Sequence, residues 1–313
     1  MVVVKKSKQE VAKRDLLARQ TDGLLRTLAK HLDVDSDDLS LRVAAELEFY
    51  IMHGEEQLSI DSLKIKDIKK FLFQYKHNGL RLESFEEEDG VNQFEVQFFP
   101  TEHPLELAQN IEDFRNVILD VADADFRAKP FADQPGSSIH FHISLYYKGE
   151  NLFSKDNPRD DNEYHYLPLY WSIAGMLAWM LPAMRIFAPT QNCYDRYLYP
   201  KDGQKYIHYP TGCCWGFNNR TCALRIPIKP TEDPYNCRIE HRVASSLSDP
   251  YLDMFAIFSA MQHGIANELE CPEPVFGNSF DDAHDFIPQF PKTLAESERL
   301  FHSGVFANLK ELI

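Results

Sequence analysis

The sequence predicts an α+β fold with a largely antiparallel sheet. Segments in which apolar and ionisable side chains alternate, a pattern typical of strands, are interspersed with segments of helical periodicity. They do not follow the regular strand–helix alternation of parallel folds. The chain contains neither a G-x-x-x-x-G-K-S/T loop nor a G-x-G-x-x-G motif, which argues against the parallel nucleotide-binding folds. It also lacks internal repeats, and its 313 residues are enough to bury a large core.

Helices are expected where apolar side chains recur every three or four residues. The first such segment carries leucines at this spacing and is followed by a polar turn. Pro104 stands in the first turn of another predicted helix. Backbone N–H groups in the first turn have no hydrogen-bond partner within the helix, so proline is tolerated there. The predicted helices span 8–33, 59–75, 104–124, 167–188, 250–268 and 293–313.

Strands are expected where apolar residues alternate with polar ones or where aromatic residues gather between turn signals. The predicted strands span 42–52, 80–85, 92–99, 139–147, 215–226 and 237–243. Two stretches are predicted to be irregular, namely a polar linker at 155–164 and a long loop at 190–211. Loops of that length within a compact domain are usually functional or disordered.

Composition excludes several kinds of partner. A net charge of −15 argues against nucleic acid and against anionic membranes. Segment 167–188 is the only candidate membrane span, but Pro182 and Arg185 interrupt it, so we expect a buried core helix. No signal peptide opens the chain, and the six cysteines show no C-x-x-C spacing. We therefore expect reduced thiols and a cytoplasmic protein.

Ionisable side chains share one face on three of the predicted strands. Side chains two residues apart on a strand point the same way, and ionisable groups inside a fold need partners or a metal ion. One interpretation is a buried two-metal site. The alternative is a solvent-exposed sheet face, or one on which cross-strand salt bridges pair the charges. The residues concerned are Glu46 and Glu48; His140, His142 and Ser144; and Arg238, Glu240 and Arg242.

Arginines accompany these carboxylates. Guanidinium groups recognise phosphate and carboxylate through a planar fork of donors, and Mg²⁺ usually works beside phosphates. Arg196, Arg220 and Arg225 lie near or on predicted strands, as do Arg238 and Arg242. Acidic metal ligands with many arginines therefore favour phosphoryl transfer from a nucleotide. The turn at Gly136 either allows close approach of a ligand or is an ordinary turn.

Several segments, in order, resemble motifs of the glutamine synthetase catalytic domain, a family that includes γ-glutamyl ligases acting on other amines. Glu46-Leu47-Glu48-Phe49 resembles E-P-E-F/Y, and Arg238-Ile239-Glu240-His241-Arg242 resembles R-I/V/L-E-V/Y-R. The other matching segments are 83–95, 129–144 with its H-x-H-x-S, 192–196, 219–227 and 249–252. The resemblance implies a single catalytic domain over 1–313 with a curved sheet flanked by helices. In it, 1–40 would form an N-terminal helix and turn, and 41–313 the catalytic core and C-terminal helices.

The resemblance also implies residue roles and an activity. ATP would phosphorylate a glutamate-like γ-carboxylate, and ammonia or another amine would displace phosphate from the acyl phosphate. Two Mg²⁺ or Mn²⁺ ions would be held, one by Glu48, Glu88 and Glu95 and the other by Glu46, His140 and Glu240, with a one-residue slip between Glu87 and Glu88 left open. The nucleotide would contact Glu83, His142, Ser144, Arg225 and Arg238; Arg220 would neutralise the transferring phosphate; and Gly136, Arg196 and Arg242 would bind substrate.

The sequence also departs from the family pattern. Pro135 stands where the family has Asn, Asp195 replaces a Lys, and no Glu lies between Arg196 and Arg220, where a flap normally supplies a catalytic Glu. The family's N-terminal β-grasp domain is not recognisable. These departures leave open a non-catalytic nucleotide- and metal-binding regulatory protein, or one subunit of a split ligase whose partner chain supplies the β-grasp domain. On that interpretation we expect a monomer, dimer or hetero-complex and not a dodecamer.

Overall fold

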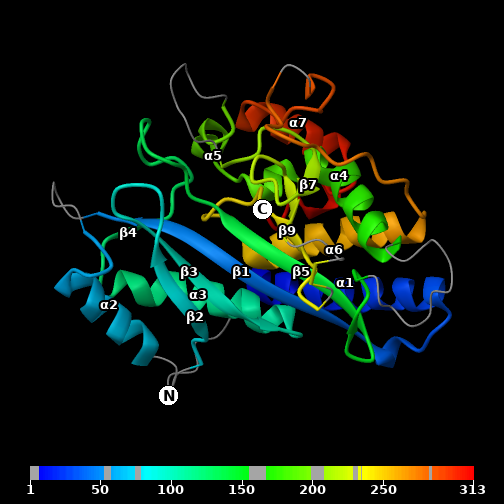
Figure 1. Ribbon diagram of the computed structural model, residues 1–313, viewed down its shortest axis with the longest axis horizontal. Helices are drawn as coiled ribbons and strands as arrows, with labels where there is room; N and C mark the ends of the chain where they lie inside the picture. Colours follow the sequence, from blue (N-terminus) through cyan, green and yellow to red (C-terminus); the bar gives the residue numbers. More distant parts are fainter. Residues whose placement is uncertain are drawn as a thin grey trace.

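The computed structural model describes residues 7–52, 58–74, 79–154, 167–198, 208–227, 232–233, 235–281 and 284–313. These residues form a nine-stranded sheet with the order β2-β3-β1-β5-β9-β8-β7, to which β4 adds beside β1 and β6 beside β5 (Figure 1). Every strand pair is antiparallel except β7 with β8. The predicted α+β class with a largely antiparallel sheet is therefore confirmed.

The long strand β1 organises the sheet. It alternates buried and half-exposed residues along most of its length, which gives one face to the core and the other to the site. It begins at Leu39, earlier than predicted, because 39–41 pair with 145–147 of β5. The strands are β1 Leu39–Ile51, β2 Leu82–Glu87, β3 Gln93–Thr101, β4 Ala124–Asp125, β5 Ile139–Tyr147, β6 Glu150–Asn151, β7 Trp215–Phe217, β8 Leu224–Ile226 and β9 Ile239–His241.

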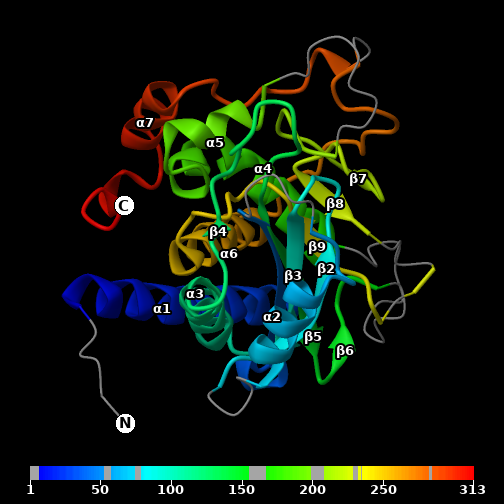
Figure 2. The same ribbon diagram turned by 90° about the vertical axis from the view of Figure 1, so that its left-hand side faces the viewer.

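Helices cover the core face of the sheet. Figure 2 shows α1, α3 and α6 on one side of it, and α1 and α3 both contact β1. The helices are α1 Lys8–Leu32, α2 Leu63–Gln74, α3 Pro104–Leu119, α4 Leu167–Phe187, α5 Gln191–Asp195, α6 Pro250–Ala266 and α7 Leu294–Ser303, with 3-10 turns at Ser36–Asp38 and Ala307–Leu309. Side chains of α1 belong to the same continuous core as those of the sheet and of α4 and α6.

Several predicted boundaries were wrong. Helix 104–124 ends at Leu119, because the last residues predicted to be helical turn back and form β4 against β1. The predicted strand 215–226 is two short parallel strands, β7 and β8, joined by a turn. Helix 293–313 stops at Ser303, and loop 190–211 contains the short helix α5. Linker 155–164 lies outside the described residues.

The closest helix contact joins α4 to α6. A Cβ added to Gly175 would overlap the carbonyl oxygen of Ala260, and one added to Gly264 would overlap that of Trp171. The two backbones therefore touch, which only glycine permits. Among the described residues α4 is the one helix whose length and composition would suit a membrane span, yet more than half of its most apolar stretch is buried against the rest of the protein. It has the packing expected of a core helix.

Candidate functional site

Strand pairing assembles the carboxylates and histidines on the sheet face opposite the helices. Glu48 of β1 lies directly opposite Glu95 of β3, and Glu46 lies opposite His140 of β5. Apolar residues between them, such as Leu47, point into the core. Segments far apart in the sequence therefore place ionisable groups side by side on one surface.

The same row continues across β5, β9 and β8. His142 lies opposite Glu240, and Glu240 lies opposite Arg225. The Glu240 carboxylate is fully buried and forms ion pairs with Arg225, at 2.8 Å, and with Arg242. Burial opposes ionisation, but the charges of Arg242, of the two histidines and of Arg225 lower the pKa of Glu240 to about 2. Glu240 is therefore an anion held between cations.

The potential metal ligands form three overlapping groups. His140 Nδ1 lies 3.5 Å from a Glu46 oxygen and 3.6 Å from a Glu240 oxygen. His142 Nε2 is buried 3.1 Å from a Glu46 oxygen without a hydrogen bond between them. In each group, ligand atoms lie within 4.8 Å of one another: Glu46, Glu95 and His140; Glu46, His142 and Glu240; Glu48, Glu88 and Glu95. All six predicted metal residues thus lie together, and His142, predicted to contact nucleotide, lies with them.

Burial and, after it, crowded negative charge raise the pKa of two of these carboxyl groups. Burial, followed by the charge of Glu48, raises the pKa of Glu88 to about 7. Burial, followed by the charges of Glu46 and Glu48, raises the pKa of Glu95 to about 9. Buried like charges are costly unless a cation neutralises them. The carboxylate and imidazole donor set suits Mg²⁺ or Mn²⁺.

The structure also separates Glu88 from Glu87. The Glu88 carboxyl group joins the group with Glu48 and Glu95, whereas the Glu87 carboxylate accepts a hydrogen bond from the backbone N–H of Ile60. Glu87 therefore faces away from the site, and the register leaves Glu88 as the potential ligand.

The larger of two adjoining pockets contains most of these groups, with a volume of about 710 Å³. Arg196 is nearly buried on its wall, where it donates to the backbone carbonyl of Val243 at 2.5 Å. Gly136 has no room for a side chain, because a Cβ there would lie 2.7 Å from the carbonyl oxygen of Ala128. The predicted residues lining this pocket are Glu46, Glu48, Glu88, Glu95, Gly136, His140, Arg196, Arg220, Arg225, Glu240 and Arg242.

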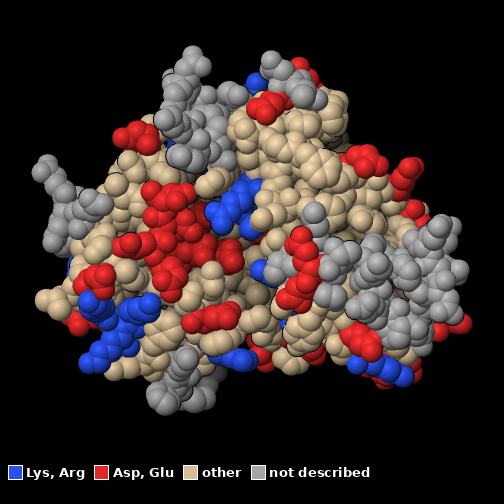
Figure 3. Space-filling view, in the orientation of Figure 1, with Lys and Arg blue, Asp and Glu red and all other residues tan. Residues whose placement is uncertain are grey.

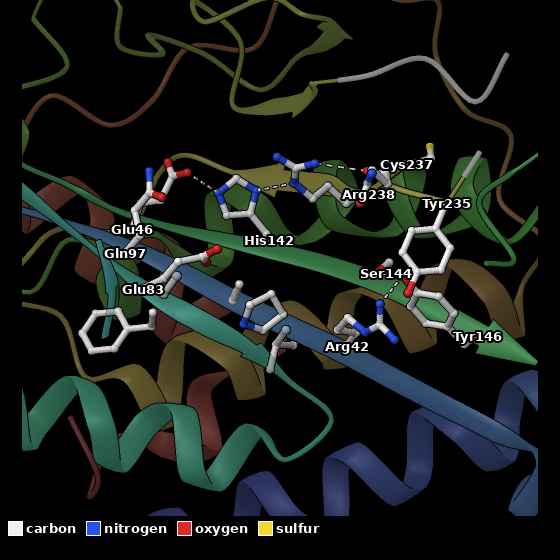
Figure 4. A pocket seen from close by; sticks show the side chains of 16 residues that line it. Arg42, Glu46, Glu83, Gln97, His142, Ser144, Tyr146, Tyr235, Cys237 and Arg238 are labelled. Atoms are coloured by element: carbon white, nitrogen blue, oxygen red, sulfur yellow. Dashed lines mark hydrogen bonds and ion pairs between the residues drawn. The ribbon is translucent and has the colours of Figure 1, made fainter. Parts of the chain in front are cut away.

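The smaller pocket, of about 320 Å³, contains the rest of the predicted set: Glu83, His142, Ser144 and Arg238. Figure 4 shows His142 between Glu46 and Arg238, whose Nε donates to His142 Nδ1 at 3.0 Å. Arg225, predicted with the nucleotide, lines the larger pocket instead. The two pockets meet at Glu46 and Gln97, which line both.

Sequence reasoning missed several residues of the smaller pocket. The guanidinium carbon of Arg42 lies 4.3 Å from the centre of the Tyr146 ring and 5.9 Å from the centre of the Tyr235 ring. A signal for two of them was present, since Arg42 continues the even-numbered face of β1 and Tyr146 continues that of β5. Gln97 carried a similar signal, because it lies two residues after Glu95 on β3 and shares its face. Tyr235 carried no such signal, because only the folding of the chain brings it to this pocket.

The surface shows the same combination of charges. On the face seen in Figure 3, a dense group of carboxylates adjoins a smaller group of basic side chains. Of the arginines that line the larger pocket, Arg220 is exposed, whereas Arg242 is buried. Carboxylates for cations and arginines for anions therefore face one cavity, which is what binding a metal–phosphate group requires.

Comparison with known proteins identifies the family. A family model described as the catalytic domain of glutamine synthetase matches residues 62–311. The chain belongs to the glutamine synthetase family. It is 36% identical over 201 residues to γ-glutamylputrescine synthetase PuuA of Escherichia coli, covering 62% of this chain and 39% of that protein. It is 35% identical over 240 residues to type-1 glutamine synthetase 2 of Dictyostelium discoideum, covering 73% and 43%.

The fold agrees with this membership. The solved structure titled "Apo GmaS without ligand" superposes with a TM-score of 0.71 at 22% identity, covering 94% of this chain and 69% of that one. This chain therefore has a glutamine synthetase-like fold, and it spans less than half the length of the two sequence relatives above. Both relatives are named as synthetases and are ligases.

Proposed function

We propose that this chain catalyses ATP-dependent ligation of a glutamate-like acid to ammonia or another amine. The γ-carboxylate is activated as an acyl phosphate, and the amine then displaces phosphate. The observation that carries the proposal is the meeting of the two pockets at Glu46 and Gln97. One pocket has a cationic and aromatic lining, and the other combines metal-type ligands with arginines. The relatives named as γ-glutamylputrescine synthetase and glutamine synthetase support this class.

The residues divide the work between the pockets. In the smaller pocket Ser144, Arg238 and the Arg42–Tyr146 pair would hold the nucleotide, with its phosphates directed toward Glu46. In the larger pocket Arg220 would neutralise the transferring phosphate. Arg242, which lines the same pocket as Gly136, would bind the substrate carboxylate or phosphate. Phosphoryl transfer depends mainly on such positioning and charge neutralisation.

The carboxylates fit Mg²⁺ or Mn²⁺. The raised pKa values of Glu88 and Glu95, together with the close approach of His142 Nε2 to Glu46, are what a cluster built for cations shows before it binds them. One ion would bind to Glu48, Glu88 and Glu95, and the other to Glu46, Glu240 and a histidine. Bound there, divalent ions supply Lewis acidity beside the phosphate.

Calorimetry and a phosphate-release assay test the proposal. The full chain should bind ATP only when Mg²⁺ or Mn²⁺ is present, and it should release phosphate when glutamate and an amine are added together. Glu88→Gln should abolish the ATP binding that Mg²⁺ or Mn²⁺ supports. ATP binding that is indifferent to divalent cations would contradict the assignment of the carboxylate cluster.

A second candidate is a binding or regulatory protein without turnover. Pro135, which lines the larger pocket, carries no side-chain donor or acceptor, and no Glu occurs between Arg196 and Arg220. This candidate predicts metal-dependent nucleotide binding without phosphate release for any acid and amine pair. Turnover that disappears in Glu88→Gln would exclude it. For either candidate we place the protein in the cytoplasm, where its six free cysteines would stay reduced.

A further inference from the structure

Ser138 contacts a residue from each of the two potential metal sites. It directly precedes β5 and lies beside Glu48 of β1, whose backbone N–H donates to the Ser138 carbonyl at 2.9 Å. On its other side it forms a β-bridge with Ser245, which follows β9. Ser138 lines the larger pocket, yet only 6% of it is exposed. Its backbone is therefore fixed between β1 and the segment after β9.

Two donors of Ser138 hold the carboxylate of Glu48. The backbone N–H of Ser138 donates to Glu48 Oε2 at 2.8 Å, and the Ser138 hydroxyl donates to the same oxygen at 3.0 Å. Hydrogen bonds to an ionised carboxylate are stronger than those between neutral groups. Together they fix the rotation of the carboxylate, and both come from one residue.

The same hydroxyl oxygen also lies 2.9 Å from Nε2 of His140. A serine hydroxyl has one hydrogen and two lone pairs, whereas a carboxylate only accepts. Because its hydrogen is donated to Glu48, the Ser138 oxygen is the acceptor toward His140, which places a hydrogen on Nε2. The nearest Glu48 oxygen lies 3.8 Å from Nε2, which is too far to accept that hydrogen.

The opposite nitrogen of the His140 ring faces two carboxylates. Nδ1 lies 3.5 Å from a Glu46 oxygen and 3.6 Å from a Glu240 oxygen. An imidazole binds a metal ion through an unprotonated nitrogen, and the hydrogen bond made by the other nitrogen decides which one that is. With the Nε2 hydrogen held by Ser138, Nδ1 is the nitrogen that an ion between Glu46 and Glu240 would bind.

The second histidine of the cluster does not offer such a nitrogen. Arg238 Nε donates to His142 Nδ1 at 3.0 Å, and a guanidinium cannot accept, so Nδ1 of this ring is occupied by the donor. In the neutral ring the hydrogen is then on Nε2, the atom 3.1 Å from Glu46. Of the two histidines, His140 is the one whose unprotonated nitrogen faces the carboxylates.

We infer that Ser138 is a positioning residue that orients one ligand of each metal ion, the carboxylate of Glu48 in one site and the imidazole of His140 in the other. The inference rests on the metal assignment in the proposed function. A single hydroxyl prepares both sites because it donates to the carboxylate and accepts from the ring. Without it, the His140 ring is free to rotate or to carry its hydrogen on Nδ1, where the hydrogen would exclude the ion.

Calorimetric titration of the full chain with Mn²⁺ alone, without nucleotide, tests the inference. Ser138→Ala should weaken the ion at the His140 site by about 10- to 100-fold. It should weaken the other ion less, because the backbone N–H of Ser138 still donates to Glu48. Glu88→Gln removes a ligand of that other ion only, so adding Ser138→Ala to this variant measures the His140 site by itself.

Ser137→Ala is the matched control. Ser137 is the neighbouring serine and is fully buried, and its hydroxyl accepts a hydrogen bond of 3.3 Å from Gln93, which belongs to none of the three ligand groups. This variant should bind Mn²⁺ as the wild type does. Urea unfolding in EDTA measures how far each substitution destabilises the metal-free protein, and so separates a loss of packing from a loss of metal affinity.

NMR of protein with isotope-labelled histidine reports where the ring hydrogen lies. The signals of His140 are those that disappear in His140→Asn. In the wild type with saturating Mg²⁺, Nε2 should carry the hydrogen and Nδ1 should carry none. This measurement does not depend on the stability of Ser138→Ala, and it requires no turnover.

The outcomes separate this inference from the proposed function. Equal Mn²⁺ affinities in wild type and Ser138→Ala, or equal losses in Ser138→Ala and Ser137→Ala, would overturn the role of Ser138 and leave the ligase assignment intact. A Mg²⁺-bound His140 ring with its hydrogen on Nδ1 would do the same. The expected loss of Mn²⁺ affinity in a protein that never releases phosphate would support the role of Ser138 and remove only the proposed turnover. A wild type that binds no Mn²⁺ would overturn both.

Discussion

Replacing Glu95 with glutamine should stabilise the metal-free protein while removing its response to Mg²⁺. The unfolded side chain titrates near 4.5, and burial among Glu46 and Glu48 raises the folded pKa to about 9. At pH 7 the unfolded side chain is ionised and the folded one is protonated, so folding takes up a proton. The free energy of this uptake is set by the difference between the solution pH of 7 and the unfolded pKa of 4.5. At roughly 1.4 kcal/mol per pKa unit, this costs on the order of 3 kcal/mol. Glutamine carries no charge and avoids this cost.

The sign of the pH dependence follows from the same shift. Between pH 4.5 and about 9 the folded state binds a proton that the unfolded state releases, so the free energy of unfolding falls as pH rises through that window. In Glu95→Gln this part of the slope should vanish. The hydrogen bond of 3.0 Å from Gln97 Nε2 can persist, since the new amide oxygen also accepts.

Glu240→Gln provides the matched opposite case. Glu240 has a pKa of about 2 because the charges of Arg242, of the two histidines and of Arg225 stabilise its anion against burial. Neutralising it leaves the buried guanidinium of Arg242 without its carboxylate partner, which costs about 3–5 kcal/mol. Urea unfolding in EDTA at pH 6, 7 and 8, repeated with Mg²⁺, measures both variants. If Glu95→Gln were destabilised like Glu240→Gln, or were still stabilised by Mg²⁺ as the wild type is, the interpretation of the carboxylate cluster would be refuted.

The remaining predictions concern packing, nucleotide binding and a buried acid. Gly175→Ala should lower the free energy of unfolding by at least about 1–3 kcal/mol, because its methyl group overlaps the Ala260 carbonyl oxygen. Gly23→Ala is the control in the same urea titration. It lies in the interior of α1, where the nearest atom to the new methyl group is 3.5 Å away, so this substitution should be neutral or stabilising. Arg42→Ala should weaken ATP binding by about tenfold in calorimetry and leave metal-dependent stabilisation unchanged, because Arg42 lies over Tyr146 and outside the ligand groups. Burial raises the pKa of Asp253 well above 3.8, against the lowering effect of the hydrogen bond of 2.5 Å that Ser248 donates to it. The folded state therefore keeps a proton that the unfolded state loses. Stability should therefore fall as pH rises above about 4, and Asp253→Asn should flatten the difference between unfolding curves at pH 5 and pH 8; an unchanged difference would contradict a protonated Asp253.

The sequence determined which residues could meet. The alternation in segments 42–52, 139–147 and 237–243 placed ionisable side chains on one strand face and apolar ones on the other, because successive side chains on a strand point to opposite sides. That local rule and the motifs were enough to predict the sheet class and the six metal-type residues that the structure brings together. The same rule would have added Arg42 and Tyr146 had the pattern been followed to the strand ends.

The tertiary structure decided which residues from distant segments come into contact, because local periodicity carries no information on strand pairing. Strand register selected Glu88 over Glu87, and it placed His142 beside Glu46 and Glu240. The contact between His208 and Asp89 joins a loop to a distant turn. Such contacts follow from which strands pair and in which register, and these depend on the packing of the whole chain. Helix ends were mispredicted for the same reason: α3 stops where pairing of β4 with β1 takes the following residues.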